Sequence, residues 1–248
     1  MGWLMERWLV CLVLPWVVWG WAPGAGWGQD LPVVEAAPGP KLYEASWPEQ
    51  PRSTAELDSH CSNLGERDPF TAGQCDLQVM AGMYNRSGLG PGGPPFDYVP
   101  IAFRFGYMVT SPLFDQTWAR GNVEALLEAQ YSPVIKEFGH YIVGPDLIFR
   151  YNFVQPECPL VPYIQGGAGF VFTDGYKWPS PYQRLIGEQF EFLLRAEFGI
   201  RFMVTECVSL DAEAGFQHIS NARLAPRNAG VNNVGVTVGL TYFFGKPK

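Results

Sequence analysis

Residues 190–202 read Phe-Glu-Phe-Leu-Leu-Arg-Ala-Glu-Phe-Gly-Ile-Arg-Phe, and apolar side chains alternate with polar or small ones along most of this stretch. Every even position is apolar, whereas four of the odd positions are Glu or Arg. A period of two places successive side chains on opposite faces of a β-strand. A tilted strand needs about 9 to 11 residues to cross a bilayer. The stretch therefore predicts one long strand with an apolar face and a charged face.

Further runs of the chain show the same alternation. They occupy residues 77–84, 99–107, 123–131, 141–153, 164–172, 208–216 and 234–244. Together with the first run they give eight amphipathic strands, an even number that fits two architectures. One is a soluble barrel with an apolar interior, and the other is an outer-membrane barrel with an apolar exterior.

Several features favour the membrane barrel. The apolar faces are long, and aromatic residues gather toward the strand ends, as they do at membrane interfaces. The opposite faces carry charges of both signs, which can pair inside a narrow barrel: Arg104, Glu124, Glu128, Asp146, Arg150, Glu191, Arg195, Glu197, Arg201, Asp211 and Glu213. We therefore predict an all-β protein, an eight-stranded antiparallel transmembrane β-barrel of the bacterial outer membrane at residues 76–244, with a tail at 245–248.

The predicted connections alternate in length, which also fits an outer-membrane barrel with long external loops and short periplasmic turns. The longer segments are residues 85–96, 132–139, 174–187 and 221–231. The others are generally shorter and occupy residues 111–118, 155–159 and 205–207. This alternation places both chain ends in the periplasm.

The first residues predict export from the cytoplasm. A charged start is followed by an apolar run at residues 8–22 and by small residues up to Gly28, which is the pattern of a secretory signal peptide at residues 1–28. A retained anchor helix is the alternative, but the run is short and contains Pro15. Residues 29–75 are rich in Pro, Ser, Glu and Asp up to about Gly73 and show no sustained period, so they are predicted to be an irregular periplasmic leader.

Removal of the signal peptide leaves four cysteines, Cys61, Cys75, Cys158 and Cys207. An even number in an oxidising compartment predicts two disulfides, and four cysteines permit three pairings. We favour Cys61 with Cys75 and Cys158 with Cys207. A cysteine-based zinc site is less well supported, because the sequence has no C-x-x-C motif and only three His. No metal and no organic cofactor is predicted.

Charge excludes one class of partner. The net charge of -7 and the isoelectric point near 5.0 argue against a polyanion, and the sequence has no basic patch interleaved with aromatic residues. We therefore predict that the protein does not bind nucleic acid.

A base and a nucleophile lie at the end of the seventh predicted strand. His218 and Ser220 continue the even, apolar stripe of that strand, so both are predicted to face the lipid at its outer end. Asn232 has the same parity at the start of the neighbouring strand. Such a histidine can take the proton of a serine that attacks an ester, provided that a third group orients the imidazole.

The segments His218-Ile-Ser-Asn-Ala and Asn228-Ala-Gly230 resemble the signature of the PagL family of outer-membrane lipid A 3-O-deacylases. The resemblance implies an eight-stranded barrel whose His, Ser and Glu remove an ester-linked acyl chain from lipopolysaccharide at the membrane-facing surface. It implies His218 as the base, Ser220 as the nucleophile and Asn228 as part of the oxyanion hole. Asn221 is a motif residue expected to support the site on the substrate side.

The sequence departs from the family pattern at two positions. Asn232 stands where characterised members have the Glu of the triad, and Arg223 stands where they have Gly. An amide oxygen can still accept from the imidazole N–H, but it stabilises an imidazolium less than a carboxylate does. For Arg223 we predict contact with a lipid phosphate.

The leading hypothesis is thus an outer-membrane esterase, a carboxylic ester hydrolase that acts on lipid A of lipopolysaccharide among the outer-membrane lipids. One alternative is a catalytically silent structural or adhesive barrel, and another is a soluble lipocalin-like binding barrel. A homodimer is compatible with each hypothesis.

Overall fold

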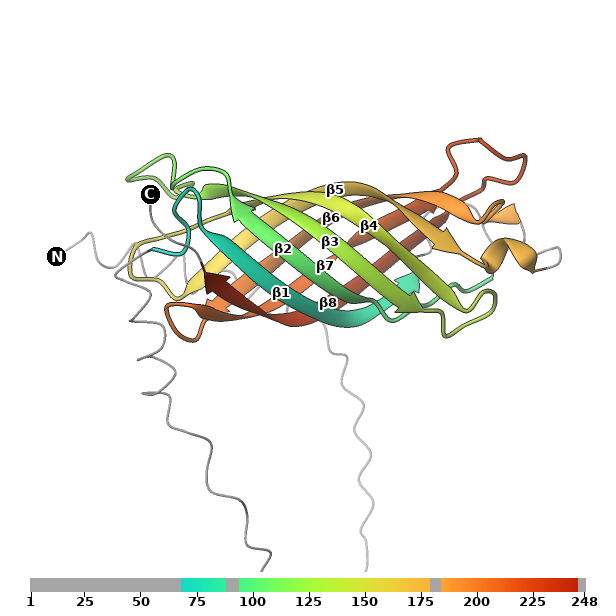
Figure 1. Cartoon of the computed structure of the whole chain (residues 1–248), viewed down its shortest axis with the longest axis horizontal. Helices are drawn as coiled ribbons and strands as arrows, with labels where there is room; N and C mark the ends of the chain where they lie inside the picture. The colour runs from blue at the N-terminus through green and yellow to red at the C-terminus, as the bar shows by residue number, and fades with distance from the viewer. Residues whose placement is uncertain (1–67, 88–93, 179–183, 245–248) are drawn as a thin grey trace, which may run out of the picture. The chain divides into compact units, whose positions relative to one another are not determined.

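Each alternating run forms a strand in the computed structural model, which describes residues 68–87, 94–178 and 184–244. The strands are β1 (Cys75–Arg86), β2 (Ile101–Met108), β3 (Asn122–Pro133), β4 (Tyr141–Asn152), β5 (Leu160–Thr173), β6 (Phe190–Met203), β7 (Val208–Ser220) and β8 (Val231–Phe244). Each strand pairs antiparallel with the next, and β8 pairs with β1 to close the barrel (Figure 1). The prediction of an eight-stranded antiparallel barrel is confirmed.

The wall is apolar outside and charged inside. On β6, Leu194 and Phe198 expose 53% and 63% of their surface, whereas Arg195 and Arg201, of opposite parity, expose 6% and 0%. The same alternation of buried and exposed residues recurs along β2, β3 and β4. This arrangement is the reverse of a soluble barrel, so the lipocalin-like alternative is wrong and the outer-membrane architecture holds.

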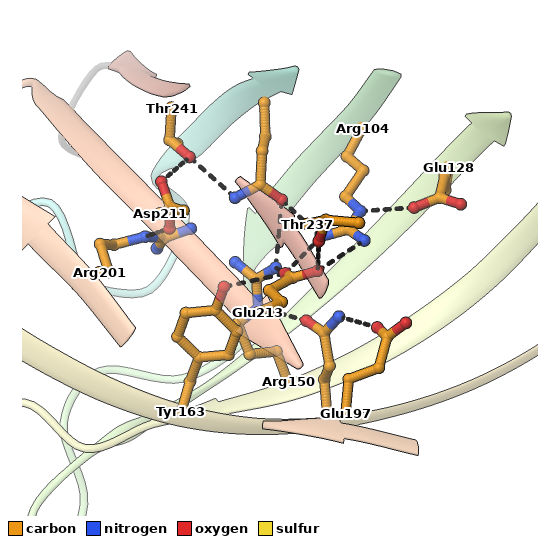
Figure 2. Close-up of polar contacts among 12 residues, drawn as sticks. Arg104, Glu128, Arg150, Tyr163, Glu197, Arg201, Asp211, Glu213, Thr237 and Thr241 are labelled. Atoms are coloured by element: carbon orange, nitrogen blue, oxygen red, sulfur yellow. Dashed lines mark hydrogen bonds and ion pairs between the residues drawn. The ribbon is translucent and has the colours of Figure 1, made fainter. Parts of the chain in front are cut away.

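The buried charges form ion pairs between strands (Figure 2). The guanidinium of Arg104 contacts Glu128 at 2.5 Å and Glu213 at 2.6 Å. Arg195 contacts Glu128 at 2.7 Å, and Arg201 contacts Asp211 at 2.7 Å. Because a shift of one residue would turn these groups toward the outside, the pairs favour a single strand register.

The alternation of long and short connections is wrong at one place. The connection of residues 109–121 between β2 and β3 is longer than that of residues 134–140 between β3 and β4. The extra length forms a small hairpin, in which Leu113 and Gly121 exchange backbone hydrogen bonds of 2.6 and 3.1 Å. A hairpin of this kind satisfies its own backbone groups, and strand periodicity gives no sign of it.

Residues just before β1 close the same end of the barrel. Phe70 is 3% exposed and packs in a cluster with Met108, Val161 and Phe243. Its backbone carbonyl accepts a 2.9 Å hydrogen bond from the side chain of Asn122. This segment belongs to the predicted leader, whose other residues up to 67 lie outside the described ranges, as do the predicted signal peptide and the tail.

The cysteines follow the prediction only in part. Cys75 is a free thiol, so the expected bond with Cys61 is absent there. Cys75 shares the parity of the outward-facing Leu77, and its side chain is therefore directed to the outer surface. Cys158 and Cys207 both take part in disulfide bonds, whereas Cys61 lies outside the described residues.

In the part of the chain that the structure describes, no helix is long and apolar enough to cross a membrane. A single turn of 3-10 helix, η2 (Gly175–Lys177), follows β5.

Candidate functional site

Strand pairing brings three predicted site residues together at one end of the barrel. His218 of β7 lies directly opposite Asn232 of β8, and Ser220 lies opposite Phe192 of β6. His218, Ser220 and Asn232 are all half-buried and have the parity of the outward-facing residues. The three side chains therefore share the membrane-facing surface, near the point where β7 ends.

The three side chains form one hydrogen-bonded row. His218 Nδ1 lies 2.5 Å from Asn232 Oδ1, and His218 Nε2 lies 2.9 Å from Ser220 Oγ. An amide oxygen can only accept, so Nδ1 carries the ring proton and donates it to Asn232. In this tautomer Nε2 has a free lone pair, and the Ser220 hydroxyl donates to it. The geometry leaves the imidazole ready to accept the serine proton.

Two asparagines hold the loop that follows β7. Asn221 is fully buried, and its Nδ2 donates to the carbonyl of Arg227 at 2.9 Å while its Oδ1 accepts from the backbone N–H of Arg223 at 3.1 Å. The backbone N–H of Asn221 donates to Asn228 Oδ1 at 2.9 Å. Asn221 therefore supports the loop from inside and is not at the surface that would meet a substrate. Asn228 Oδ1 is thus occupied, and within the described ranges the amide N–H groups of Asn228 have no acceptor.

Gly230 lies against the catalytic candidate. Its φ of +71° is in the left-handed region, and a Cβ there would lie 3.0 Å from Cε1 of His218 and 3.3 Å from Cβ of Ser220. A larger residue would therefore press on the imidazole ring and the nucleophile. Glycine meets both demands, because it has no Cβ and accepts a positive φ without strain.

Aromatic rings cover the outer wall beside Ser220. Phe190 stacks on Phe170 with ring centroids 5.6 Å apart, and it meets Phe172 at 5.8 Å and Phe192 at 5.1 Å. Because Phe192 is the cross-strand partner of Ser220, this aromatic cluster (Phe170, Phe172, Phe190 and Phe192) borders the nucleophile directly. Alternation in the sequence predicts the strands that carry these rings but not the cluster, which arises from the register between β5 and β6.

Three arginines lie at the same end of the barrel, and only one of them, Arg223, was predicted from the sequence to belong to the site. Arg223 is exposed in the loop after β7, with a φ of +69°. Arg184 and Arg227 lie beside it around an open cleft, yet nothing in their local sequence marks them. Among the described residues, no group of three or more His, Cys, Asp or Glu is arranged to hold a metal ion.

Solved structures similar to this chain include an outer membrane enzyme and a neisserial surface protein. The crystal structure of the outer membrane enzyme PagL aligns with a TM-score of 0.47 and 17% identity, covering 66% of this chain and 97% of that one. Neisserial surface protein A aligns with a TM-score of 0.47 and 14% identity, covering 68% of this chain and 96% of that one. No curated protein sequence matches the chain.

A family model gives the assignment. The model described as lipid A 3-O-deacylase (PagL) matches residues 101–241, which is more than half of the chain. The matched range runs from the first residue of β2 into β8 and includes His218, Ser220 and Asn232. The resemblance stated from the sequence is confirmed, and this chain belongs to the PagL family of lipid A 3-O-deacylases.

Proposed function

We propose that this protein is an outer-membrane esterase that removes an ester-linked acyl chain from lipid A at the membrane-facing edge of the barrel. The observation that carries the proposal is the row formed by Ser220, His218 and Asn232, with contacts of 2.9 and 2.5 Å. A hydroxyl and an imidazole have no packing role on an apolar outer face. Membership of a deacylase family supplies the substrate class.

The first half of the reaction transfers the acyl group to the enzyme. Ser220 Oγ attacks the ester carbonyl while His218 Nε2 takes the hydroxyl proton. The tetrahedral intermediate then collapses, the C–O bond to the sugar breaks, and the imidazolium returns its proton to the leaving sugar oxygen. In the second half, a water deprotonated by His218 attacks the acyl-serine, which releases a fatty acid and restores Ser220.

We assign to Asn228 the role of stabilising the oxyanion. Its Oδ1 is occupied by the backbone N–H of Asn221 at 2.9 Å, which leaves the amide N–H groups as donors. A fixed donor aimed at a developing negative charge lowers the barrier most effectively in a water-poor site. Asn228 is half-buried, and an acyl chain bound on the neighbouring outer wall would exclude further water from its amide.

The aromatic cluster supplies a surface for the acyl chain. Phe192 is 37% exposed and lies across from Ser220, so a chain lying along the rings would bring its ester carbonyl to the nucleophile. The substrate is already in the bilayer that surrounds the barrel. It therefore reaches the site by lateral diffusion and needs no closed pocket.

The test is the mass of lipid A after incubation with purified protein in detergent micelles. We expect the unmodified protein to release one acyl chain, Ser220→Ala to release none, and Ser111→Ala, a serine far along the chain at the opposite barrel end, to behave as the unmodified protein does. The alternative of a catalytically silent barrel predicts no mass change with any of the three. That outcome, with a known deacylase active in parallel, would refute the esterase.

A further inference from the structure

Arginines gather around an open cleft beside the proposed active site. The cleft has a volume of about 770 Å³, and Arg184, Arg223 and Arg227 line it together with Asn228. All three arginines are exposed. The protein as a whole has a net charge of -7, so this cluster is a local reversal of charge.

Backbone contacts between two loops build the cluster. The N–H of Ala229 donates to the carbonyl of Arg184 at 2.8 Å, and the N–H of Gly230 donates to the carbonyl of Leu185 at 3.0 Å. A Cβ on Gly187 would lie 2.0 Å from the carbonyl oxygen of Arg227. The segment before β6 thus approaches the β7–β8 loop so closely that only glycine fits, and this approach brings Arg184 beside the loop arginines.

Arg223 holds its place in an unfavourable conformation. Its φ of +69° follows a φ of +51° at Ala222. Both values lie in the left-handed region, which residues other than Gly, Asn and Asp rarely adopt. The Oδ1 of Asn221 fixes this turn through the Arg223 N–H. Glycine would relieve the strain, so the guanidinium is present at a cost in stability.

The three guanidinium groups have no acidic partner in the described ranges. Within residues 68–87, 94–178 and 184–244, no carboxylate lies within 4.0 Å of any of them. Two other basic groups at this end of the barrel do have a carboxylate partner, since Lys136 contacts Asp97 at 3.1 Å and His140 contacts Asp174 at 2.7 Å. Three exposed guanidiniums around one cleft, without a carboxylate partner in these ranges, form a site of positive charge that suits an anion.

We propose that Arg184, Arg223 and Arg227 bind a phosphate monoester on the headgroup of the glycolipid substrate and so set which ester reaches Ser220. Guanidinium forks match the oxygens of a phosphate and form strong charge-assisted hydrogen bonds. The cleft and the site share Asn228, which lines the first and is tied to Asn221 beside Ser220. The headgroup would thus be held above the membrane edge while the acyl chain lies on the aromatic cluster. This inference rests on the proposed function.

Binding is measured in the Ser220→Ala background, where no turnover occurs. Full-length protein in neutral detergent is titrated with bisphosphorylated lipid A and with the same lipid after phosphatase treatment. We expect the triple variant Arg184→Gln, Arg223→Gln and Arg227→Gln to bind the phosphorylated lipid at least about tenfold more weakly and the dephosphorylated lipid unchanged. The matched control, Lys136→Gln, removes a paired cation at the same end and should change neither affinity.

A second variant covers the case in which the triple variant fails to fold. Arg223→Gly relieves the left-handed strain, so it should fold at least as stably while losing affinity for phosphorylated lipid alone. Equal affinities for both lipids in all variants would overturn the proposal. Arginine-dependent binding of inorganic phosphate without any preference between the lipids would also overturn it, because the cleft would then be a free-anion site.

The two proposals fail separately. Arginine-dependent preference for phosphorylated lipid without acyl release by the unmodified protein would remove the esterase and leave the headgroup site. Acyl release with the same KM for phosphorylated lipid in the unmodified protein and the arginine variants would leave the esterase and remove the headgroup site.

Discussion

Asn232 decides how well the imidazole can work. Its Oδ1 lies 2.5 Å from His218 Nδ1, so the orienting hydrogen bond of a triad is present without the negative charge of a carboxylate. Orientation fixes the tautomer before the attack, whereas charge stabilises the imidazolium that forms during it. The neutral amide therefore supplies the first effect and lacks the second.

Substitutions at Asn232 separate these two effects. We expect Asn232→Ala to lower kcat/KM for lipid A deacylation by at least about tenfold, because the ring loses its orienting partner. Asn232→Glu should preserve or raise kcat, because it restores a carboxylate beside the imidazolium. Val234→Ala, an outward-facing change on the same strand, serves as the control. Equal deacylation rates for the unmodified protein, Asn232→Ala and Asn232→Glu would show that Asn232 does not orient His218.

Gly230 offers a second test at the scale of one residue. A Cβ at this position would lie 3.0 Å from the imidazole ring, whereas a Cβ at Gly73, with a similar φ of +87°, would meet nothing within 4 Å. Gly230→Ala and Gly73→Ala should both destabilise the fold by about 1–2 kcal/mol through backbone strain. Only Gly230→Ala should reduce the deacylation rate in folded protein. A similar loss of rate in both variants would mean that strain, and not contact with His218, is responsible.

At the scale of elements, the β7–β8 loop depends on the buried side chain of Asn221. Its hydrogen bonds to Arg227 and Arg223 close the loop on itself, and a buried carbonyl that loses its partner costs about 1–3 kcal/mol. Asn221→Ala should therefore open the loop and speed tryptic cleavage after Arg223 and Arg227, read by mass spectrometry of the fragments. Lipid A turnover should fall with it, because Asn228 loses its anchor.

The control for this loop lies at the other end of the barrel. Gln155 donates to the carbonyl of Trp118 at 3.1 Å from an exposed position, and Gln155→Ala should leave cleavage after Arg223 and Arg227 unchanged. Cleavage of the Asn221→Ala protein at the rate of the unmodified protein would show that other contacts hold the loop.

The strands and their faces were predictable from the sequence because alternation is a local property. Parity alone placed His218, Ser220 and Asn232 on one surface, and the β7–β8 register then joined them. Contacts between distant segments leave no such periodic sign. Phe70 in the barrel end and Arg184 in the cleft could not be predicted for this reason.

At the scale of the whole molecule, the barrel inverts the usual distribution of charge. Its interior contains Arg104, Arg150, Arg195 and Arg201, each at most 6% exposed. Figure 2 shows Arg104, Arg150 and Arg201 among carboxylates from other strands. Burial of charges is costly unless each one is paired and hydrogen-bonded. Loss of one shared carboxylate should therefore affect several strands at once.

Glu213 is the sharpest test of this interior. Its carboxylate contacts Arg104 at 2.6 Å and Arg150 at 3.2 Å, and it accepts from the hydroxyls of Tyr163 at 2.9 Å and Thr237 at 3.1 Å. Glu213→Ala leaves two guanidiniums without this partner, so the free energy of unfolding in detergent should fall by about 3–5 kcal/mol. The measurement is equilibrium unfolding in urea, followed by circular dichroism.

An exposed ion pair provides the comparison for Glu213. Asp115 contacts Arg120 at 3.1 Å, but its side chain is 75% exposed, so water and salt screen the pair. Asp115→Ala should change the free energy of unfolding by less than about 1 kcal/mol. If Glu213→Ala lowered the free energy of unfolding no more than Asp115→Ala does, the hydrogen bonds between strands would stabilise the barrel without a contribution from the charged interior. A large difference between the two would instead show that the buried network, which joins β2, β4, β5, β7 and β8 through one carboxylate, stabilises the closed barrel that carries the site on its outer face.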